Sequence, residues 1–283
     1  MPLVSLKPIL AEAKQRRVAC LGLVCLGWED ATAFVAAAEA AQTPVVLSAG
    51  PSARALMPIT LWGQMFRTLG EAAAVPVVAH LDNGNSLDEA RAALDAGFTS
   101  LMIDGSPLPL AANIARSAAL CDLVQGSEVS VEAELGKVGY QTGANRSASS
   151  GTDPQQVETF LAQVPCDCLA VSIGNRHLQT QREADIDWQR IAQIDPIAKA
   201  ADCGLVIHGG SGLHQADRRR LADRYGVQKF NIGTELRQAF GAGLRAFLHA
   251  DPEAFDRITL LNAAARAVQA RATSLLQENW QPS

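Results

Sequence analysis

The sequence predicts a (β/α)8 TIM barrel, an α/β fold, on three observations. Short apolar runs alternate about eight times with longer segments rich in Ala, Leu, Glu and Arg along the 283 residues. The apolar runs are nearly continuous, which is typical of parallel strands that are buried on both faces. Polar residues follow many of these runs. An open doubly wound sheet is the alternative, but it does not explain why polar residues gather after so many strands.

The expected elements follow the alternation in order. Eight strands are expected at residues 18–24, 44–48, 76–81, 99–103, 129–132, 168–173, 205–208 and 227–231. Helices are expected between and after them at residues 29–41, 59–73, 86–96, 109–125, 154–164, 188–201, 214–224 and 234–250. A final helix near residues 252–278 lies beyond the repeat. No change in composition marks a second domain, so we expect a single barrel domain over residues 1–283 with an additional C-terminal helix.

Composition argues against several classes of partner. The net charge of −5 gives no basic surface for nucleic acid. No apolar run approaches the roughly 20 residues that a membrane span needs. The first residues lack the apolar core and cleavage site of a signal peptide. We therefore expect a cytoplasmic protein of enzyme size.

The six cysteines do not form the framework of a disulfide-rich secreted domain. They are Cys20, Cys25, Cys121, Cys166, Cys168 and Cys203. Most lie within apolar patterns, where a free cysteine behaves as a small hydrophobic residue. Cys166 and Cys168 lack the spacing of a CxxC motif, so packing in the core is favoured over a metal or redox pair.

Two glycine-containing turns carry the clearest functional signal. Residues 208–212 read His-Gly-Gly-Ser-Gly, and residues 231–235 read Asn-Ile-Gly-Thr-Glu. Each follows an expected strand and precedes an expected helix, where free backbone N–H groups bind anions. Either turn alone is an ordinary connection. As a consecutive pair after the seventh and eighth strands, they predict a phosphate site, with Gly209, Ser211, Asn231 and Thr234 as its substrate-binding residues.

Polar residues also follow the other strands. They are His80, Asp82 and Asn83 after the third strand, Asp104 after the fourth, Glu132 and Glu134 after the fifth, Asn175 and His177 after the sixth, His208 after the seventh and Asn231 after the eighth. In a barrel these positions converge on one rim. Histidines and carboxylates beside a phosphate site indicate a divalent metal next to a phosphorylated substrate. His80 lies within its strand and is interpreted as a supporting or core residue.

One segment has the composition of a long loop. Residues 140–151, after the fifth strand, are rich in Gly, Ser and Asn and have no periodicity. The segment is either a lid over the rim or a surface loop of no consequence.

Six segments together resemble a known family. Residues 79–82, 102–106, 130–136, 169–174, 206–212 and 231–236 are similar, in order, to segments of the class II ketose-bisphosphate aldolases. This family comprises the metal-dependent fructose- and tagatose-bisphosphate aldolases, and the resemblance runs from about residue 3 to beyond residue 250. It implies a (β/α)8 barrel, a lyase acting on a phosphorylated sugar, and a homodimer or homotetramer.

The resemblance also implies a metal mechanism. In the family a zinc ion held by three histidines polarises the carbonyl of dihydroxyacetone phosphate and stabilises its enediolate. His177 and His208 match two of these ligands. The third falls on Asn83, whose neutral amide oxygen is a weaker zinc ligand than imidazole. The metal is therefore lost, weakly held or different, unless an acidic residue such as Glu132 or Asp104 completes the site.

Asp82 matches the aspartate that protonates the aldehyde oxygen during condensation in the family, and it is the predicted catalytic residue. The alternative role is to cap the helix that begins near Ser86.

Three features depart from the family pattern. Leu178 replaces a glycine whose backbone meets the phosphate. Residues 138–143 contain no carboxylate, so the usual base is missing. Residues 19–24 lack the Phe-Asn pair common in the family.

Three functions therefore remain open. The first is a metal-dependent aldolase acting on a phosphorylated ketose. The second is a barrel that binds phosphate esters but carries out a different lyase or isomerase reaction, with or without metal. The third is a non-catalytic accessory paralogue. Arginines of the late helices, such as Arg237 or Arg266, could also reach the site of a neighbouring chain.

Overall fold

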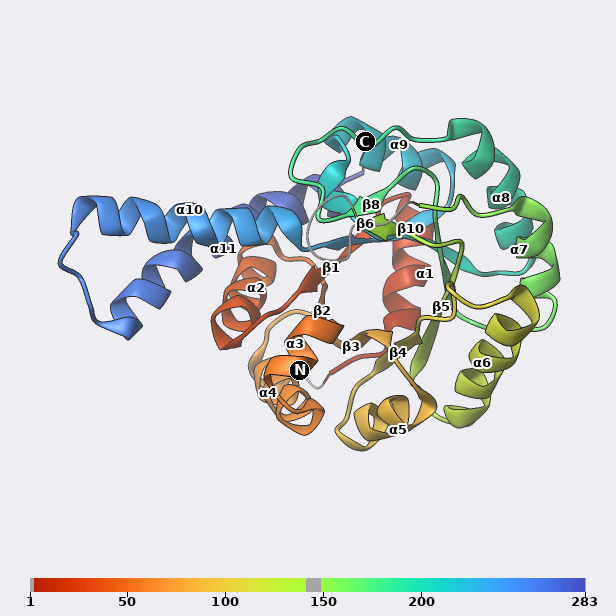
Figure 1. Ribbon diagram of the computed structural model, residues 1–283, viewed down its shortest axis with the longest axis horizontal. Coiled ribbons are helices and arrows are strands. Elements are labelled where there is room, and N and C mark those ends of the chain that lie inside the picture. The colour runs from red at the N-terminus through yellow and green to blue at the C-terminus, as the bar shows by residue number, and fades with distance from the viewer. Residues whose placement is uncertain (1–2, 141–148, 283) are drawn as a thin grey trace.

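The computed structural model describes residues 3–140 and 149–282 and contains a closed barrel of eight parallel strands (Figure 1). The order around the barrel is β1-β10-β9-β7-β5-β4-β3-β2. The strands are β1 (Cys20–Val24), β2 (Val45–Ala49), β3 (Val77–Gly84), β4 (Ser100–Ile103), β5 (Ser130–Leu135), β7 (Cys168–Val171), β9 (Gly204–Ile207) and β10 (Val227–Ile232). The predicted TIM barrel is confirmed, with strand ends that differ from the expected ones by up to three residues.

Helices cover the outside of the barrel, as the alternation predicts. They are α2 (Trp28–Ala41), α4 (Ile59–Ala72), α5 (Leu87–Asp95), α6 (Leu110–Leu123), α7 (Pro154–Leu161), α8 (Trp188–Ala200), α9 (Gln215–Arg224), α10 (Thr234–Ala250) and α11 (Arg257–Trp280). The last of these is the additional C-terminal helix. Figure 1 shows α10 and the first part of α11 running side by side as an arm that projects from the barrel.

Several short elements were not expected from the sequence. They are α1 (Leu6–Arg16), α3 (Pro51–Leu56), the 3-10 helix η1 (Gly210–Gly212), and the two-residue strands β6 (Gly139–Tyr140) and β8 (Arg176–His177). Strands β6 and β8 pair with each other in a separate small sheet. Except for α1, these segments carry too few residues for a periodic pattern to be recognised. Helix α1 has eleven residues and was overlooked because it precedes the first strand of the repeat.

Helix α1 closes the N-terminal end of the barrel. Ser5 caps the helix, and its hydroxyl lies 2.6 Å from that of Ser130 at the start of β5. The buried residues Leu6 and Ile9 belong to one apolar cluster with Val46 and Val206, which come from the barrel strands. The lower part of the barrel interior is therefore filled and dry.

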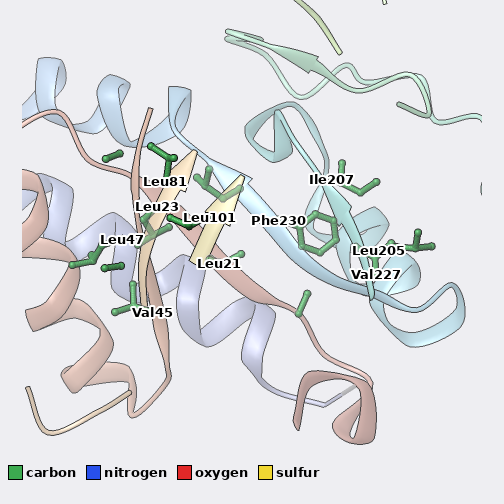
Figure 2. Close-up of a cluster of buried hydrophobic side chains, with 14 of the residues drawn as sticks. Leu21, Leu23, Val45, Leu47, Leu81, Leu101, Leu205, Ile207, Val227 and Phe230 are labelled. Atoms are coloured by element: carbon green, nitrogen blue, oxygen red, sulfur yellow. The ribbon is translucent and has the colours of Figure 1, made fainter. Parts of the chain in front are cut away.

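The outward-facing residues of the strands form the larger core. Figure 2 shows leucine, isoleucine, valine and phenylalanine side chains from several strands packed between the sheet and the helices. Labelled examples are Leu21, Leu23, Val45, Leu47, Leu81, Leu101, Leu205, Ile207, Val227 and Phe230. These side chains are almost fully buried. The near-continuous apolar strands of the sequence thus reflect burial on both faces.

Above the apolar layer, the barrel interior contains a charged pair. Lys229 of β10 and Glu132 of β5 are fully buried, and their Nζ and Oε2 atoms lie 2.7 Å apart. Burial alone would lower the pKa of Lys229, but the Glu132 carboxylate raises it above its ordinary value. The Lys229 ammonium and a hydrogen bond from His208 hold the pKa of Glu132 well below its usual range despite burial. Both groups are therefore charged.

The cysteine interpretation agrees with the structure. All six cysteines are free thiols, and five of them are buried. Cys166 packs near Cys203 rather than pairing with Cys168, with 3.9 Å between the sulfur atoms. Residues 141–148 of the predicted loop lie outside the described residues. Within the described residues, no helix is long and apolar enough to cross a membrane.

Replacing Lys229 by Met should lower the free energy of unfolding by about 3–5 kcal/mol, because Glu132 then keeps a buried charge without its partner. Lys199→Met is the matched control. Lys199 pairs with Asp195 at the same 2.7 Å distance, but its side chain is 53% exposed, so the loss there should stay below about 1 kcal/mol. Urea denaturation of both variants measures the difference, and equal losses would contradict the role assigned to the buried pair.

Candidate active site

A cavity of about 290 Å³ opens at the C-terminal ends of the strands. It is lined by Val24, Gly50, Pro51, Ser52, Asp82, Asn83, His177, Leu178, Gly209, Ser211, Asn231, Gly233, Thr234 and Arg237. Seven of the nine residues predicted as site residues are in this list. His208 and Glu132 are the other two, and both are fully buried. The strand-end residues therefore converge as the barrel predicts.

The two glycine-containing turns form one side of the cavity. Gly209 has a left-handed φ of 66°, and a Cβ atom there would lie 2.2 Å from the carbonyl oxygen of Arg176. Ser211 accepts a hydrogen bond from the backbone N–H of Glu235 at 3.2 Å. Thr234 is the first residue of α10. Backbone N–H groups at the start of a helix favour an anion, so this side of the cavity suits a phosphate group.

His208 is held in one orientation by Glu132. Its Nε2 atom lies 2.9 Å from Oε1 of Glu132, whose other oxygen is paired with Lys229. We assign the Nε2 proton to this hydrogen bond, which directs Nδ1 toward the site. Nδ1 lies 3.5 Å from Oε2 of Glu134. The predicted ligand Glu132 thus has both oxygens occupied, and these contacts favour a positioning role for it.

His177 comes from the small strand β8 rather than from the barrel strand β7, which ends at Val171. Its ring stands edge-on to that of His208, with 5.8 Å between the ring centres. Burial and the neighbouring His208 lower the pKa of His177 to about 3, so its imidazole is neutral. Burial opposes protonation of His208, but Glu132 and Glu134 raise its pKa to about 9. In the metal-free protein the two rings therefore differ in charge, and a metal ion at Nδ1 would displace the second proton of His208.

Asn83 has a left-handed φ of 49°, a conformation that asparagine tolerates better than most residues. The guanidinium of Arg54 holds this backbone in place. It donates to the carbonyl oxygens of Asp82 at 2.7 Å and Asn83 at 3.0 Å, and it pairs with Glu89 at 2.7 Å. Arg54 belongs to α3, and its side chain is almost fully buried.

The donor atoms beside His177 fit a divalent metal. Oδ1 of Asn83, Nδ1 of His208 and Oε2 of Glu134 are buried, and none has a hydrogen-bond partner. Within the described residues, no group of three His, Cys, Asp or Glu side chains forms a metal cluster. Asn83, at the position predicted for the third ligand, offers an amide oxygen instead. Two imidazoles with amide and carboxylate oxygens are ligands that zinc and related ions accept.

Asp82 lines the cavity beside Asn231, the first residue of the second glycine turn. Its Oδ1 accepts a hydrogen bond from Nδ2 of Asn231 at 3.2 Å. The alternative capping role is wrong, because Ser86 itself caps α5 by accepting from the N–H of Glu89. Asn231 is therefore directed toward Asp82. Gly22 of β1 leaves room for it, since a Cβ atom there would lie 2.5 Å from Oδ1 of Asn231.

Other predicted residues lie around this centre. His80 is fully buried in β3, where Nδ1 lies 2.9 Å from the hydroxyl of Ser100. Its interpretation as a supporting or core residue agrees with this position. Asp104 accepts a hydrogen bond from the N–H of Ser106 at 2.8 Å. Burial raises the pKa of Glu134 to about 8, with Asp104 and Asp82 adding to the shift against the opposing charge of His208.

Sequence reasoning missed the roles of Arg54, Lys229, Glu134 and Arg237. The sequence does contain a signal for the role of Lys229. It is a lysine in the middle of an apolar strand, and it lies two positions before Asn231 and hence on the same face of the strand. Arg237 follows Thr234 by three residues, so both lie on one face of α10. It lines the cavity of its own chain. No local pattern marks Arg54, because its partners come from β2, β3 and α5.

Comparisons with known proteins agree with this geometry. The model of the family "Fructose-bisphosphate aldolase class-II" matches residues 4–279. A fructose-bisphosphate aldolase of Geobacillus stearothermophilus is 32% identical, covering 98% of this chain and 97% of that protein. A 6-phospho-5-dehydro-2-deoxy-D-gluconate aldolase of Bacillus subtilis is also 32% identical, covering 98% and 96%.

A solved structure supports the same assignment. The crystal structure of the YdjI aldolase from Escherichia coli K12 superposes with a TM-score of 0.85 at 26% identity, covering 99% of this chain and 98% of that one. The family match spans nearly the whole chain, and the barrel and its cavity agree with it. The chain belongs to the class II fructose-bisphosphate aldolase family.

Proposed function

We propose that this chain catalyses reversible aldol cleavage of a phosphorylated ketose, with dihydroxyacetone phosphate or a similar donor as one product. The observation that carries the proposal is that Asp82, Asn83, His177 and the glycine turns all line one cavity. A phosphate-binding wall and a polar reaction centre thus lie within the reach of one small sugar phosphate.

His177, His208 and Asn83 would hold a divalent cation, with zinc as the expected metal. The unpartnered Oδ1 of Asn83 and Nδ1 of His208 support this assignment. Glu134 would provide the nearest carboxylate, and Glu132 would fix the orientation of His208 through their 2.9 Å hydrogen bond. When bound, such a cation supplies Lewis-acid polarisation of a substrate oxygen.

Asp82 would carry the proton of the carbon–carbon bond step. In condensation its carboxyl group gives a proton to the aldehyde oxygen as the new bond forms, and in cleavage the carboxylate takes that proton back. Asn231 holds Asp82 through Nδ2 at 3.2 Å, while its buried Oδ1 has no partner. That oxygen is therefore available to a substrate hydroxyl, which suits Asn231 better than direct contact with phosphate.

The phosphate group of the donor would bind at Gly209, Ser211 and Thr234. The N-terminus of α10 contributes backbone N–H groups there. Arg237 would contribute positive charge, because it lines the same cavity and has no acidic partner within 4.0 Å among the described residues. Leu178 lines the same cavity, and its side chain reduces the space that is left for the phosphate group.

We further propose that the chain forms a homodimer or homotetramer. Phe255, which is 91% exposed, and Ile258, which is 70% exposed, lie where the projecting arm turns from α10 to α11. Large apolar side chains at such exposure favour contact with another protein surface.

Asp82→Asn tests the function. The metal-loaded protein should release a triose phosphate from a ketose bisphosphate, and the variant should lose about 100- to 10,000-fold in kcat, because the amide cannot transfer the proton. The asparagine at position 82 retains an oxygen that accepts the hydrogen bond from Nδ2 of Asn231. Because the local structure is preserved, the metal content should not change. Asp88→Asn, at an exposed position of α5, is the control. Full activity of Asp82→Asn, or no cleavage by the wild type, would overturn the proposal.

Asn83→His should tighten zinc binding by at least about tenfold, since changes outside the ligand sphere alone already shift metal affinity by about 10–100-fold. Histidine also tolerates the left-handed conformation found at this position. Competition with a chromophoric chelator measures the affinity, and Asn85→His, on the exposed surface nearby, controls for an added imidazole. Unchanged affinity in Asn83→His would remove Asn83 from the metal site.

Leu178→Gly should lower the KM for the phosphorylated substrate, because removal of the side chain enlarges the space for the phosphate group. Leu178 has a left-handed φ of 54°, which costs roughly 1–2 kcal/mol for a residue with a Cβ atom. Glycine removes that strain but loses about 0.5–1 kcal/mol in chain entropy, so stability should change little. Leu178→Ala, which shortens the side chain but keeps the strain, is the control. A higher KM in the glycine variant would contradict the assigned position.

A further inference from the structure

A fully buried arginine lies behind the first glycine turn. Arg218 belongs to α9, on the face of the helix that also buries Leu221 and Ala222. Its Nη1 atom donates a hydrogen bond to the carbonyl oxygen of Gly210 at 3.2 Å. Because an arginine is almost never fully buried unless it is paired, its place against this turn needs a physical reason.

The ion pairs around Arg218 are long. Its Nη2 atom lies 3.5 Å from a carboxylate oxygen of Glu278, and its Nη1 atom lies 3.9 Å from one of Glu235. Nε and Nη2 have no hydrogen-bond partner among the described residues. The carbonyl of Gly210 is therefore the closest polar contact that the described residues give this guanidinium.

Glu235 is bound more tightly by two other arginines. Its Oε1 atom accepts hydrogen bonds from Arg182 and from Arg271, the latter at 2.6 Å. Burial raises the pKa of Glu235, but these two arginines lower it below its ordinary value, so the carboxylate is ionised. Three guanidinium groups thus face the two carboxylates of Glu235 and Glu278. At neutral pH this cluster carries one positive charge in excess, and Arg218 is its fully buried member.

The carbonyl of Gly210 connects the cluster to the cavity. It belongs to the same peptide group as the N–H of Ser211, and in a trans peptide the two bonds point in opposite directions. The N–H of Ser211 therefore points away from Arg218, and Ser211 lines the cavity. A cation at the carbonyl end polarises the peptide group and strengthens its N–H as a donor to an anion. The second turn is connected as well, because the N–H of Glu235 donates to the hydroxyl of Ser211 at 3.2 Å.

We propose that Arg218 is a positioning residue for the substrate phosphate, which fixes the carbonyl of Gly210 and directs the excess positive charge of the cluster to the cavity through the Gly210–Ser211 peptide group. This inference rests on the proposed function and identifies the residue that sets its phosphate affinity. The bound phosphate supplies the negative charge that the cluster lacks. Arg218 acts through the turn, so its loss weakens binding without removing a group that transfers a proton.

Replacing Arg218 tests the inference on the full-length, metal-loaded protein. Arg218→Met should raise the Kd for inorganic phosphate, measured by calorimetry at fixed ionic strength, at least about fivefold, because the peptide group loses its charged partner. The KM for the ketose phosphate should rise with it while kcat stays within about twofold, because binding and not chemistry is affected. Arg218→Lys keeps the charge, so its phosphate Kd should lie between those of Arg218→Met and the wild type.

Arg190→Met is the matched control. Arg190 also donates to one backbone carbonyl and pairs with one carboxylate, those of Thr152 and Asp187, each at 2.9 Å. Both partners lie outside the glycine turns, so the phosphate Kd should stay within about twofold of the wild-type value. Equal phosphate affinity in Arg218→Met and Arg190→Met would overturn the inference. A fall in kcat as large as the rise in KM for Arg218→Met would also overturn it, because the change would then be a general disruption of the site.

Glu278→Gln separates the effect of charge from that of packing. The amide keeps the shape of the side chain but removes a negative charge beside Arg218, so phosphate should bind at least about twofold more tightly. If Arg218 only anchors α11 to α9, this variant should weaken phosphate binding or leave it unchanged, and either result would contradict the inference.

Cleavage of the ketose phosphate by the wild type is measured separately. Phosphate binding that shifts as expected in the variants, without any cleavage, would overturn the proposed function and leave the role of Arg218 at the phosphate site standing. Cleavage by the wild type together with an unchanged phosphate Kd in Arg218→Met would overturn the inference and leave the proposed function standing.

Discussion

The buried ion pair between Lys229 and Glu132 is the interaction on which the active centre depends. A carboxylate inside a barrel is stable only when it is paired and hydrogen-bonded. Lys229 meets that need at 2.7 Å, and the second oxygen of Glu132 is then free to fix His208 at 2.9 Å. Gly22 of β1 makes the arrangement possible, since a Cβ atom there would lie 3.1 Å from Cε of Lys229. A small residue on β1 thus leaves space for a cation on β10, and that cation, through Glu132, determines how the histidine at the end of the neighbouring strand β9 is presented.

The rim above this pair contains local backbone strain on both sides of the cavity. Asn83 and Leu178 are two of the five residues other than glycine with positive φ among the described residues, and both line the cavity. Such conformations persist only where the surroundings enforce them. Arg54 enforces the first through bonds to two carbonyl oxygens. On the rim, this strain lies in the segments that present Asn83 and Leu178 to the cavity.

The sequence was sufficient for the barrel and for the set of residues on its rim, because strand periodicity and turn chemistry are local. The positions of Asp82, Asn83, Gly209 and Thr234 follow from the rule that strand ends converge. The partners of these residues do not follow from it. The hydrogen bond from Asn231 to Asp82 joins residues 149 positions apart, and Lys229 and Glu132 are 97 positions apart. Pairings of that kind depend on the register and stagger of strands around the closed barrel, which no local pattern records.

The N-termini of α10 and α2, which both begin on this rim, differ in electrostatic character. The glycine turns after β9 and the start of α10 present backbone N–H groups and Arg237, so they favour negative charge. The start of α2 also has free N–H groups, but Glu29 and Asp30 in its first turn neutralise them. Although both helices begin on the same rim, only one of them attracts an anion. Asp82 lines the same cavity as this anion-binding side and is hydrogen-bonded to Asn231 of the second glycine turn.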